Sequence, residues 1–201
     1  MAVVSGGTTL IDNGALDGAV PTGDLILLST QTASASASIS FTSGIDSTYD
    51  SYVFKFINIH PQNNGEPPLF NLSTDGGSNY NVVKTTTVFR DLHNEGDTNS
   101  GIGYRTGEDL AQSTAYQYIS AGGCGNDNDQ CFVGYLQLFN PSSTTFVKHF
   151  ICKTQLYTHD DYSYQTHMAG YANTTSAVNA IDFKFSSGNI DSGTIKMYGV
   201  G

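Results

Sequence analysis

The segment from Tyr157 to His167 holds the richest group of side chains that could recognise a ligand. It reads Tyr-Thr-His-Asp-Asp-Tyr-Ser-Tyr-Gln-Thr-His, so aromatic rings stand beside carboxylates and imidazoles. Flat rings cover the apolar faces of a sugar, while neighbouring acceptors take its hydroxyl groups. The same segment suits an exposed loop between strands, because Asp-Asp favours a turn, and the loop is the simpler interpretation. The candidate ligand-binding residues are Tyr157, His159, Asp160, Asp161, Tyr162 and Tyr164.

A second polar segment has donors that a calcium ion would accept. Asn126-Asp127-Asn128-Asp129 places hard oxygen atoms at alternate positions. The segment lacks the later bidentate Glu and the Gly of a calcium loop, so an Asx-rich turn is the ordinary alternative. We predict no bound metal and no cofactor, and leave open an ion at Asp127 and Asp129.

The three cysteines do not make a complete internal disulfide framework, because Cys124, Cys131 and Cys152 are an odd number. Cys124 and Cys131 could face each other across a hairpin and form a disulfide. Reduced, buried thiols are the default interpretation.

Known catalytic patterns are missing from the sequence. It contains no phosphate-binding loop ending in Gly-Lys-Ser/Thr, no Gly-x-Ser-x-Gly elbow and no His-Glu-x-x-His zinc helix. The glycine-rich segment 101–107 has the wrong spacing for a dinucleotide fingerprint. Glycosidases need two facing carboxylates, and nothing in the sequence brings together any two of Glu66, Glu95 and Glu108. We therefore predict that the protein is not an enzyme.

The composition of the 201 residues favours a β protein as the frame for these side chains. Charged residues make up only 13 %, the formal net charge is −10, and 12 Tyr and 11 Phe supply an aromatic share of 11 %. Disordered acidic tails lack such aromatics, and coiled coils need a different composition. No apolar run approaches the ~20 residues of a membrane helix, and residues 1–20 read as no secretory signal. The negative charge makes nucleic acid a poor partner.

Short runs of apolar and aromatic residues predict about ten strands. The strongest is 52–59, YVFKFINI, whose apolar groups on both faces predict a central strand covered on both sides. The other predicted strands are 24–29, 36–41, 69–73, 82–89, 116–119, 131–139, 145–153, 165–172, 180–185 and 194–198.

The segments between these runs complete the expected organisation. Asp-Gly-Gly at 75–77 predicts a tight turn between 69–73 and a return strand at 82–89. Residues 91–107 read as a long surface loop, and 108–115 is the one place where a short helix is plausible.

The spacing of strands and turns predicts an all-β fold, an antiparallel β-sandwich that is jelly-roll-like. Residues 1–22 alternate short apolar pairs with Gly, Asn and Asp. We predict that they form an extended N-terminal arm lying on another surface, such as a neighbouring subunit. Residues 23–201 are the predicted sandwich domain.

Several segments resemble a family of virion-associated proteins from tailed phages of marine bacteria, notably cyanophages. They are 5–9 (SGGTT), 41–50 (FTSGIDSTYD), 53–61 (VFKFINIHP), 73–80 (STDGGSNY), 138–146 (LFNPSSTTF) and 187–199 (SGNIDSGTIKMYG). The resemblance covers nearly the whole chain and implies a structural component of the particle. It carries over no catalytic residues.

Composition and resemblance together lead us to expect a non-enzymatic structural protein at the virion surface. We expect a homotrimer whose arm docks on other virion proteins of the capsid or tail, with neither nucleic acid nor a membrane as partner. Two placements are open: capsid decoration or knob, and a tail-fibre or other appendage component that contacts the host surface and its glycans. The alternative is a small carbohydrate-binding or carbohydrate-active module, such as a depolymerase, on the particle.

Overall fold

The computed structural model describes residues 3–5, 8–12, 15–16 and 25–201. All regular elements within these ranges are β-strands, which make three antiparallel sheets. No helix in the described ranges is therefore long and apolar enough to span a membrane. The smallest sheet has the order β1-β2-β3 and consists of β1 (Val3–Ser5), β2 (Thr8–Asp12) and β3 (Ala15–Leu16).

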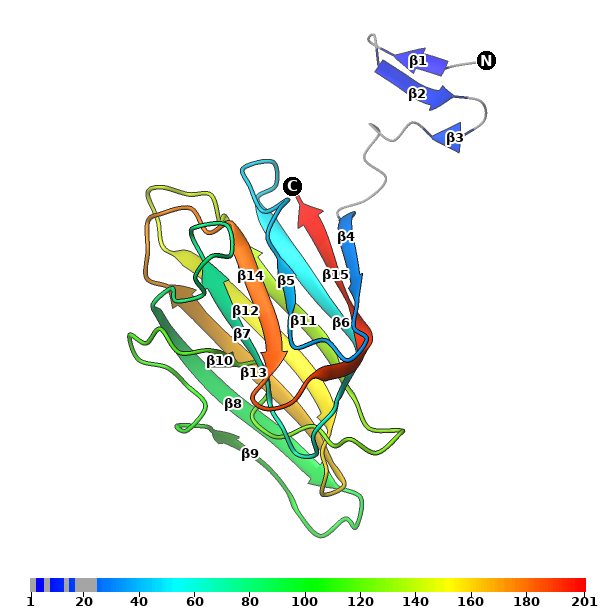
Figure 1. Ribbon diagram of the computed structural model, residues 1–201, viewed down its shortest axis with the longest axis vertical. Helices are drawn as coiled ribbons and strands as arrows, with labels where there is room; N and C mark the ends of the chain where they lie inside the picture. The colour runs from blue at the N-terminus through cyan, green and yellow to red at the C-terminus, as the bar shows by residue number, and fades with distance from the viewer. Residues whose placement is uncertain (1–2, 6–7, 13–14, 17–24) are drawn as a thin grey trace.

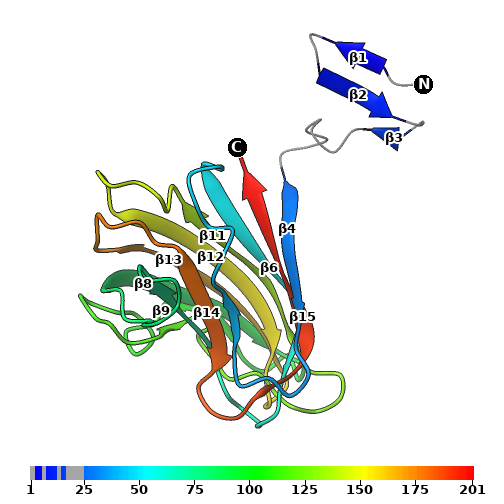
Figure 2. The same ribbon diagram turned by 45° about the horizontal axis from the view of Figure 1, so that its top comes forward.

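The other two sheets form the sandwich (Figures 1 and 2). The smaller one has the order β10 (Gln117–Tyr118), β7 (Pro68–Ser73), β14 (Ala180–Phe185) and β5 (Ile39–Phe41). The larger one has the order β4 (Ile26–Thr32), β15 (Ile190–Val200), β6 (Ser51–Pro61), β11 (Phe132–Phe139), β12 (Lys148–Tyr157), β13 (Tyr162–Ala172), β8 (Lys84–Asn94) and β9 (Ser100–Tyr104).

Eight of these strands pair in the nested order of a jelly roll. β4 pairs with β15, β5 with β14, β6 with β11 and β7 with β10. The first half of the domain thus lies antiparallel to the second half, like one long hairpin folded over into two sheets. This order confirms the predicted all-β, jelly-roll-like sandwich.

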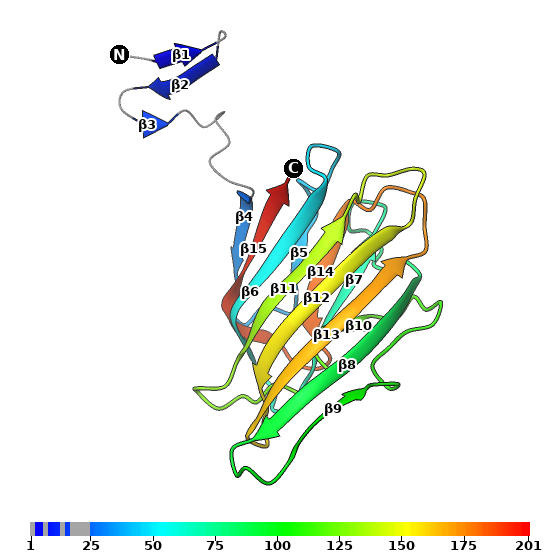
Figure 3. The ribbon, with the colours of Figure 1, turned by 180° about the vertical axis from the view of Figure 1, so that it is seen from behind.

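Two insertions widen the larger sheet. The chain adds β8 and β9 between β7 and β10, and adds β12 and β13 between β11 and β14. All four added strands extend the larger sheet beyond β11. Its outer face therefore runs without a break from β4 to β9 (Figure 3).

Aromatic rings fill the space between the two sheets. Phe54 of β6 lies 5.4 Å from the ring of Phe41 in β5 and 5.5 Å from that of Phe183 in β14. Phe54 is completely buried, because alternate residues of β6 point toward the smaller sheet. The predicted central position of β6 is correct, since the strand lies between β15 and β11. Its predicted cover on both faces is wrong: the smaller sheet packs on one side only, and Ile57 on the other side is 38 % exposed.

Lys84 is fully buried at the start of β8. Its Nζ donates hydrogen bonds to Oδ1 of Asn71 at 2.5 Å and to the carbonyl of Val82 at 2.8 Å. Burial lowers the pKa of Lys84 to about 8, because the charged form loses its hydration. No carboxylate of the described residues makes an ion pair with it. The interior thus holds a cation that only neutral groups solvate.

Lys148, at the start of β12, is the second fully buried lysine. Its Nζ donates to the carbonyl oxygens of Ser143, Phe146 and Thr174 at 2.5, 2.8 and 3.1 Å. These bonds satisfy carbonyl groups of two loops, the one that joins β11 to β12 and the one that follows β13. Both lysines therefore donate hydrogen bonds to acceptors inside the protein and place no charge on its surface.

The predicted hairpin around 75–77 is wrong. β7 pairs with β10 and β14, and β8 lies in the other sheet. Every residue of β7 is buried, so the strand needs a neighbour on each edge. Asp75 instead makes a local turn, accepting bonds from the backbone and side-chain nitrogens of Asn79 at 2.9 and 2.8 Å. Hydrogen bonds from Ser73 and Asn79 lower the pKa of Asp75 to about 2.

The segment 91–115 also differs from its prediction. β8 continues to Asn94, and β9 pairs with it inside the predicted loop. No helix forms at 108–115, since this part of the chain lies along the edge of β8. There, the backbone N–H of Thr86 donates to Leu110 at 2.9 Å, and those of Lys84 and Ser113 donate to each other's carbonyl groups.

The predicted arm, residues 1–22, lies partly outside the described residues. Its described part contains the three short strands of the small sheet, in which Ile11 lies opposite both Val3 and Leu16. Docking of the arm on another surface stays a prediction.

Candidate functional site

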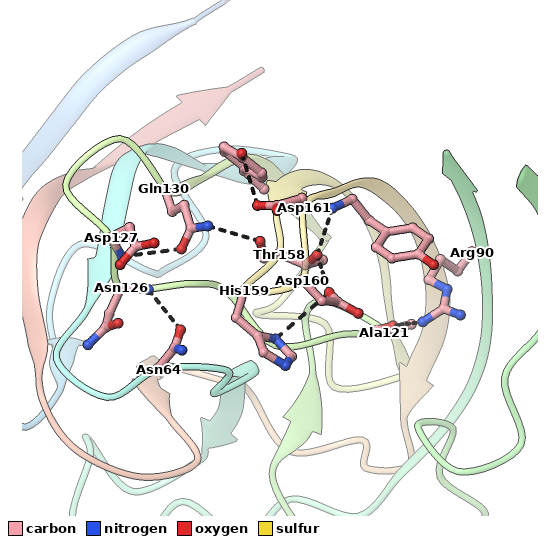
Figure 4. A network of polar contacts seen from close by, with 12 residues as sticks. Asn64, Arg90, Ala121, Asn126, Asp127, Gln130, Thr158, His159, Asp160 and Asp161 are labelled. Carbon is pink, nitrogen blue, oxygen red and sulfur yellow. Dashed lines mark hydrogen bonds and ion pairs between the residues drawn. The ribbon is translucent and has the colours of Figure 1, made fainter. Parts of the chain in front are cut away.

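The hairpin of β12 and β13 carries the candidate ligand-binding residues (Figure 4). Its turn contains only Thr158 to Asp161, because β13 already begins at Tyr162. The buried Thr158 closes the turn: its Oγ1 accepts a hydrogen bond from the N–H of Tyr162 at 3.0 Å and donates one to Asp160. Asp161 has a φ of 63°, in the left-handed region that Asp tolerates. The Asp-Asp pair therefore does form a turn.

Strand alternation divides the candidate residues between two faces. Tyr157 points to the outer face of the large sheet, whereas Tyr162 and Tyr164 point to the inner face. His159 and Asp160 are exposed in the turn, with Nδ1 of His159 3.9 Å from Oδ1 of Asp160. The six residues are thus close together in the sequence, but the hairpin does not direct their side chains toward one ligand.

Tyr164 has a structural role on the inner face. The guanidinium group of Arg90 lies over its ring, 4.1 Å from the centroid, and Nη1 of Arg90 donates to the carbonyl of Ala121 at 2.7 Å. Gly122 allows the close approach, since a Cβ there would lie 2.5 Å from the tyrosine ring. Burial raises the pKa of Tyr164. The ring and Arg90 together hold the loop that precedes Cys124 onto the sheet.

Tyr162 lies beside Tyr164 at a ring-centroid distance of 5.5 Å. Its hydroxyl accepts a hydrogen bond from Nδ2 of Asn99 at 3.1 Å. Asn99 belongs to the turn between β8 and β9, so Tyr162 joins two neighbouring hairpins. This contact also favours a structural role.

Tyr157 borders a hollow of about 300 Å³ on the outer face. The hollow is lined by His93, Asn94, Glu95, Gln155, Tyr157 and Ser163. The hydroxyl of Tyr157 donates to Oδ1 of Asp161 at 3.2 Å. The carboxylates of Glu95 and Asp161 beside the phenol raise the pKa of Tyr157 to about 12. An aromatic ring with acceptors around it is a suitable surface for a sugar.

Five polar residues that line this hollow are not among the predicted site residues: His93, Asn94, Glu95, Gln155 and Ser163. His93 and Glu95 lie in the predicted loop 91–107, where nothing in the sequence connects them to Tyr157. The connection comes from the register, which places His93 of β8 opposite Ser163 of β13. His93 lies beside Ser163 only because β8 extends to Asn94.

The segment 126–130 is an Asx-rich turn tied to the hairpin (Figure 4). Asn126 is held by the chain itself, since its N–H donates to Asn64 at 3.2 Å and its Nδ2 to Gln62 at 3.0 Å. Nε2 of Gln130 donates to the carbonyl of Thr158 at 3.2 Å. Among the residues that the structure describes, no group of three His, Cys, Asp or Glu is placed to hold a metal ion.

The three cysteines are free thiols, two of them on either side of this turn and Cys152 within β12. Cys124 and Cys152 are buried, and Cys131 is half-buried. Burial raises the pKa of Cys124 to about 12, so the thiol stays protonated and unreactive at neutral pH.

No family model, curated protein or solved structure matches this chain.

The two faces of the hairpin give different expected results on mutation. Tyr164→Ala should lower the free energy of unfolding by about 2 kcal/mol, because it removes a packed ring and the contact with Arg90. Tyr157→Ala, on the exposed outer face, should change it by less than about 1 kcal/mol. Denaturant titrations followed by circular dichroism measure both values. Equal losses in the two variants would contradict the division into a structural and an exposed face.

Proposed function

We propose that the protein is a non-enzymatic structural protein on the surface of a phage particle. The observation that carries this proposal is the nested jelly-roll order of the sandwich, an architecture found in viral capsid and lectin domains. The resemblance of six sequence segments to virion-associated proteins of marine tailed phages supports the same role.

The proposed particle protein is a homotrimer that docks through its N-terminal arm, residues 1–22. Support comes from the edge of the sandwich that follows the arm. β4 is an edge strand, and Leu25 and Leu27 beside the arm are 42 % and 52 % exposed. Apolar side chains on an unpaired edge favour contact with another chain.

Antibody labelling of intact particles tests this proposal. Gold-labelled antibodies against the chain should bind either the capsid, which would place the protein as a decoration or knob, or the tail, which would place it on a fibre or appendage. Purified protein should have three times the 21.4 kDa mass of the chain by light scattering. Particles without label would overturn the particle role, and a monomeric mass would overturn the trimer.

The second candidate function is a carbohydrate-binding or carbohydrate-active module. The hollow beside Tyr157 favours it, because a tyrosine ring, Glu95 and Gln155 surround a space of about 300 Å³. Incubation with host polysaccharide distinguishes the two candidates. Release of new reducing ends would show depolymerase activity and contradict the non-enzymatic role.

A further inference from the structure

Three lysines lie in one row across the outer face of the large sheet. The strand registers place Lys55 of β6 opposite Lys196 of β15 on one side and opposite Tyr135 of β11 on the other. Tyr135 lies opposite Lys153 of β12, and Lys153 opposite His167 of β13. We call these five residues the lysine row. Figure 3 shows their strands side by side.

All three lysine side chains point away from the core. Each lysine stands between two buried residues of its own strand, so alternation directs it to the outer face. These buried neighbours are Phe54 and Phe56, Cys152 and Thr154, and Ile195 and Met197. The row is therefore a surface feature.

The row holds three of the four positive side chains that make neither an ion pair nor a side-chain hydrogen bond within residues 25–201. The chain has eight Lys and Arg residues against a net charge of −10. The other five are engaged elsewhere: Lys84 and Lys148 are buried, Arg90 and Lys184 lie over tyrosine rings, and Arg105 pairs with a glutamate. Within residues 25–201, Lys55, Lys153 and Lys196 make no ion pair and donate no side-chain hydrogen bond, although Lys55 lies over the ring of Tyr198. Lys184, on the smaller sheet, is the fourth such side chain. At the His167 end of the row, Oδ1 of Asp91 lies 3.5 Å from Nε2 of His167.

Folding alone gives no reason for this arrangement. Like charges directly opposite on neighbouring strands destabilise a sheet, and Lys55 and Lys196 are such a pair. Their repulsion is removed when an anion binds between them. A positive row on an otherwise acidic surface thus fits a negatively charged ligand, by charge complementarity.

Aromatic rings among the lysines narrow the class of ligand. Tyr135 is 39 % exposed and lies between Lys55 and Lys153. Neighbouring strands are about 4.8 Å apart, so these two lysines lie about 10 Å apart at the backbone, with room for a ring stacked on Tyr135 between them. Two further rings border the row: Lys55 lies over the ring of Tyr198 at 5.1 Å, and His167, at one end, stacks on Phe89 at 4.7 Å. Stacking surfaces beside ammonium groups suit a sugar that carries acidic groups.

A hollow of about 410 Å³ adjoins the row. Ile151 and Ala169, on its floor, are the next outward-pointing residues after Lys153 and His167. Thr85, His149 and Tyr171 also line it, and its exposed lining is almost entirely apolar. The row and the hollow together make an extended surface across several strands, which fits a chain of sugars better than a single small ion.

We propose that the lysine row binds a linear acidic polysaccharide, one that carries carboxylate or sulfate groups. The inference rests on the proposed surface role and deepens it by naming a class of ligand. Its residues differ from those that line the Tyr157 hollow, which lies on the same outer face. The bound polymer runs across the strands, with its anionic groups at the lysines and one sugar ring on Tyr135. Because the row lies on the surface of the sheet, binding weakens as salt concentration rises.

Titration with defined polymers tests the proposal. Alginate supplies carboxylates, dextran sulfate supplies sulfates, and neutral dextran is the uncharged control. The wild-type protein should bind one or both acidic polymers and not dextran. The triple variant Lys55→Gln, Lys153→Gln and Lys196→Gln should bind roughly tenfold more weakly, since each exposed charge pair contributes modestly. Tyr135→Ala should also weaken binding, and Lys184→Gln, on the smaller sheet, should leave it unchanged.

Several results would contradict binding of an acidic polysaccharide at the lysine row. Absence of binding to both acidic polymers overturns it, as does an equal loss in Lys184→Gln. Binding of poly-glutamate as tight as that of the polysaccharides, with no effect of Tyr135→Ala, would point to an acidic protein partner and overturn the sugar ligand. Unfolding curves that match the wild type show that the variants are folded. Particle labelling without polymer binding overturns this ligand alone, and polymer binding without labelling overturns the particle role alone.

Discussion

Phe54→Ala is expected to lower the free energy of unfolding by about 3–5 kcal/mol. The ring of Phe54 is completely buried and contacts Phe41 and Phe183, which belong to the opposite sheet. Its removal leaves a cavity where the two sheets meet, and the paired strands on both sides cannot close around it. Denaturant titration measures the loss, followed by circular dichroism because the chain has no Trp.

Phe146→Ala is the matched control for this substitution. Phe146 is 69 % exposed in the loop between β11 and β12, so its loss should change stability by less than about 0.5 kcal/mol. Its carbonyl, which Lys148 uses, is unaffected by the change of side chain. A loss for Phe54→Ala no larger than that of the control would contradict the position of the core.

The stability difference between the wild type and Lys84→Met should change by about 1 kcal/mol between pH 8 and pH 9, in favour of the wild type. The pKa of Lys84 is about 8 in the folded protein, against an ordinary value of 10.5 for a lysine in water. The unfolded state therefore binds more protons between these two values, and stability rises with pH. Met keeps the unbranched shape of the side chain and removes the charge, so the variant lacks this rise.

The test compares the wild type with the variant because the buried thiols change the free energy of unfolding with pH in the opposite direction. Burial raises the pKa of Cys124 to about 12 and also raises that of Cys152, so the unfolded state loses these protons first and stability falls above about pH 9. Both proteins share this fall, and subtraction removes it. Denaturant titrations at pH 7, 8 and 9 in reducing buffer give the values. A difference that stays constant with pH would contradict a lowered pKa of the buried Lys84.

The local parts of this fold follow from the sequence, and the long-range parts do not. Alternation identifies β6, and it separates buried from exposed residues along β12 without exception before Tyr157. The hairpin predicted after β7 was wrong because a turn such as Asp75-Gly76-Gly77 says nothing about which strand comes next to β7. Its true neighbours, β10 and β14, are far along the chain. The same limit hid β9, which forms only because β8 offers an edge.

The candidate site shows the same limit at the level of side chains. The composition of the segment from Tyr157 to His167 draws attention to it, but the start of β13 decides which side chains share a face. Tyr162 and Tyr164 therefore support neighbouring loops, while Tyr157 joins His93 and Glu95. The lysine row is invisible in the sequence for a related reason. Lys55, Lys153 and Lys196 become neighbours only through the registers of β6, β11, β12 and β15.

The nested strand order also sets the sequence of events in folding. β4, the first strand of the sandwich, pairs with β15, the last one. Such distant pairings make folding slow, on the order of milliseconds to seconds, because long loops must close before contacts form. The edge strand that follows the arm therefore reaches its place only after β15 has been synthesised. An arm that docks from this edge would engage its partner only on a subunit whose folding is complete, so unfinished chains would stay out of the particle.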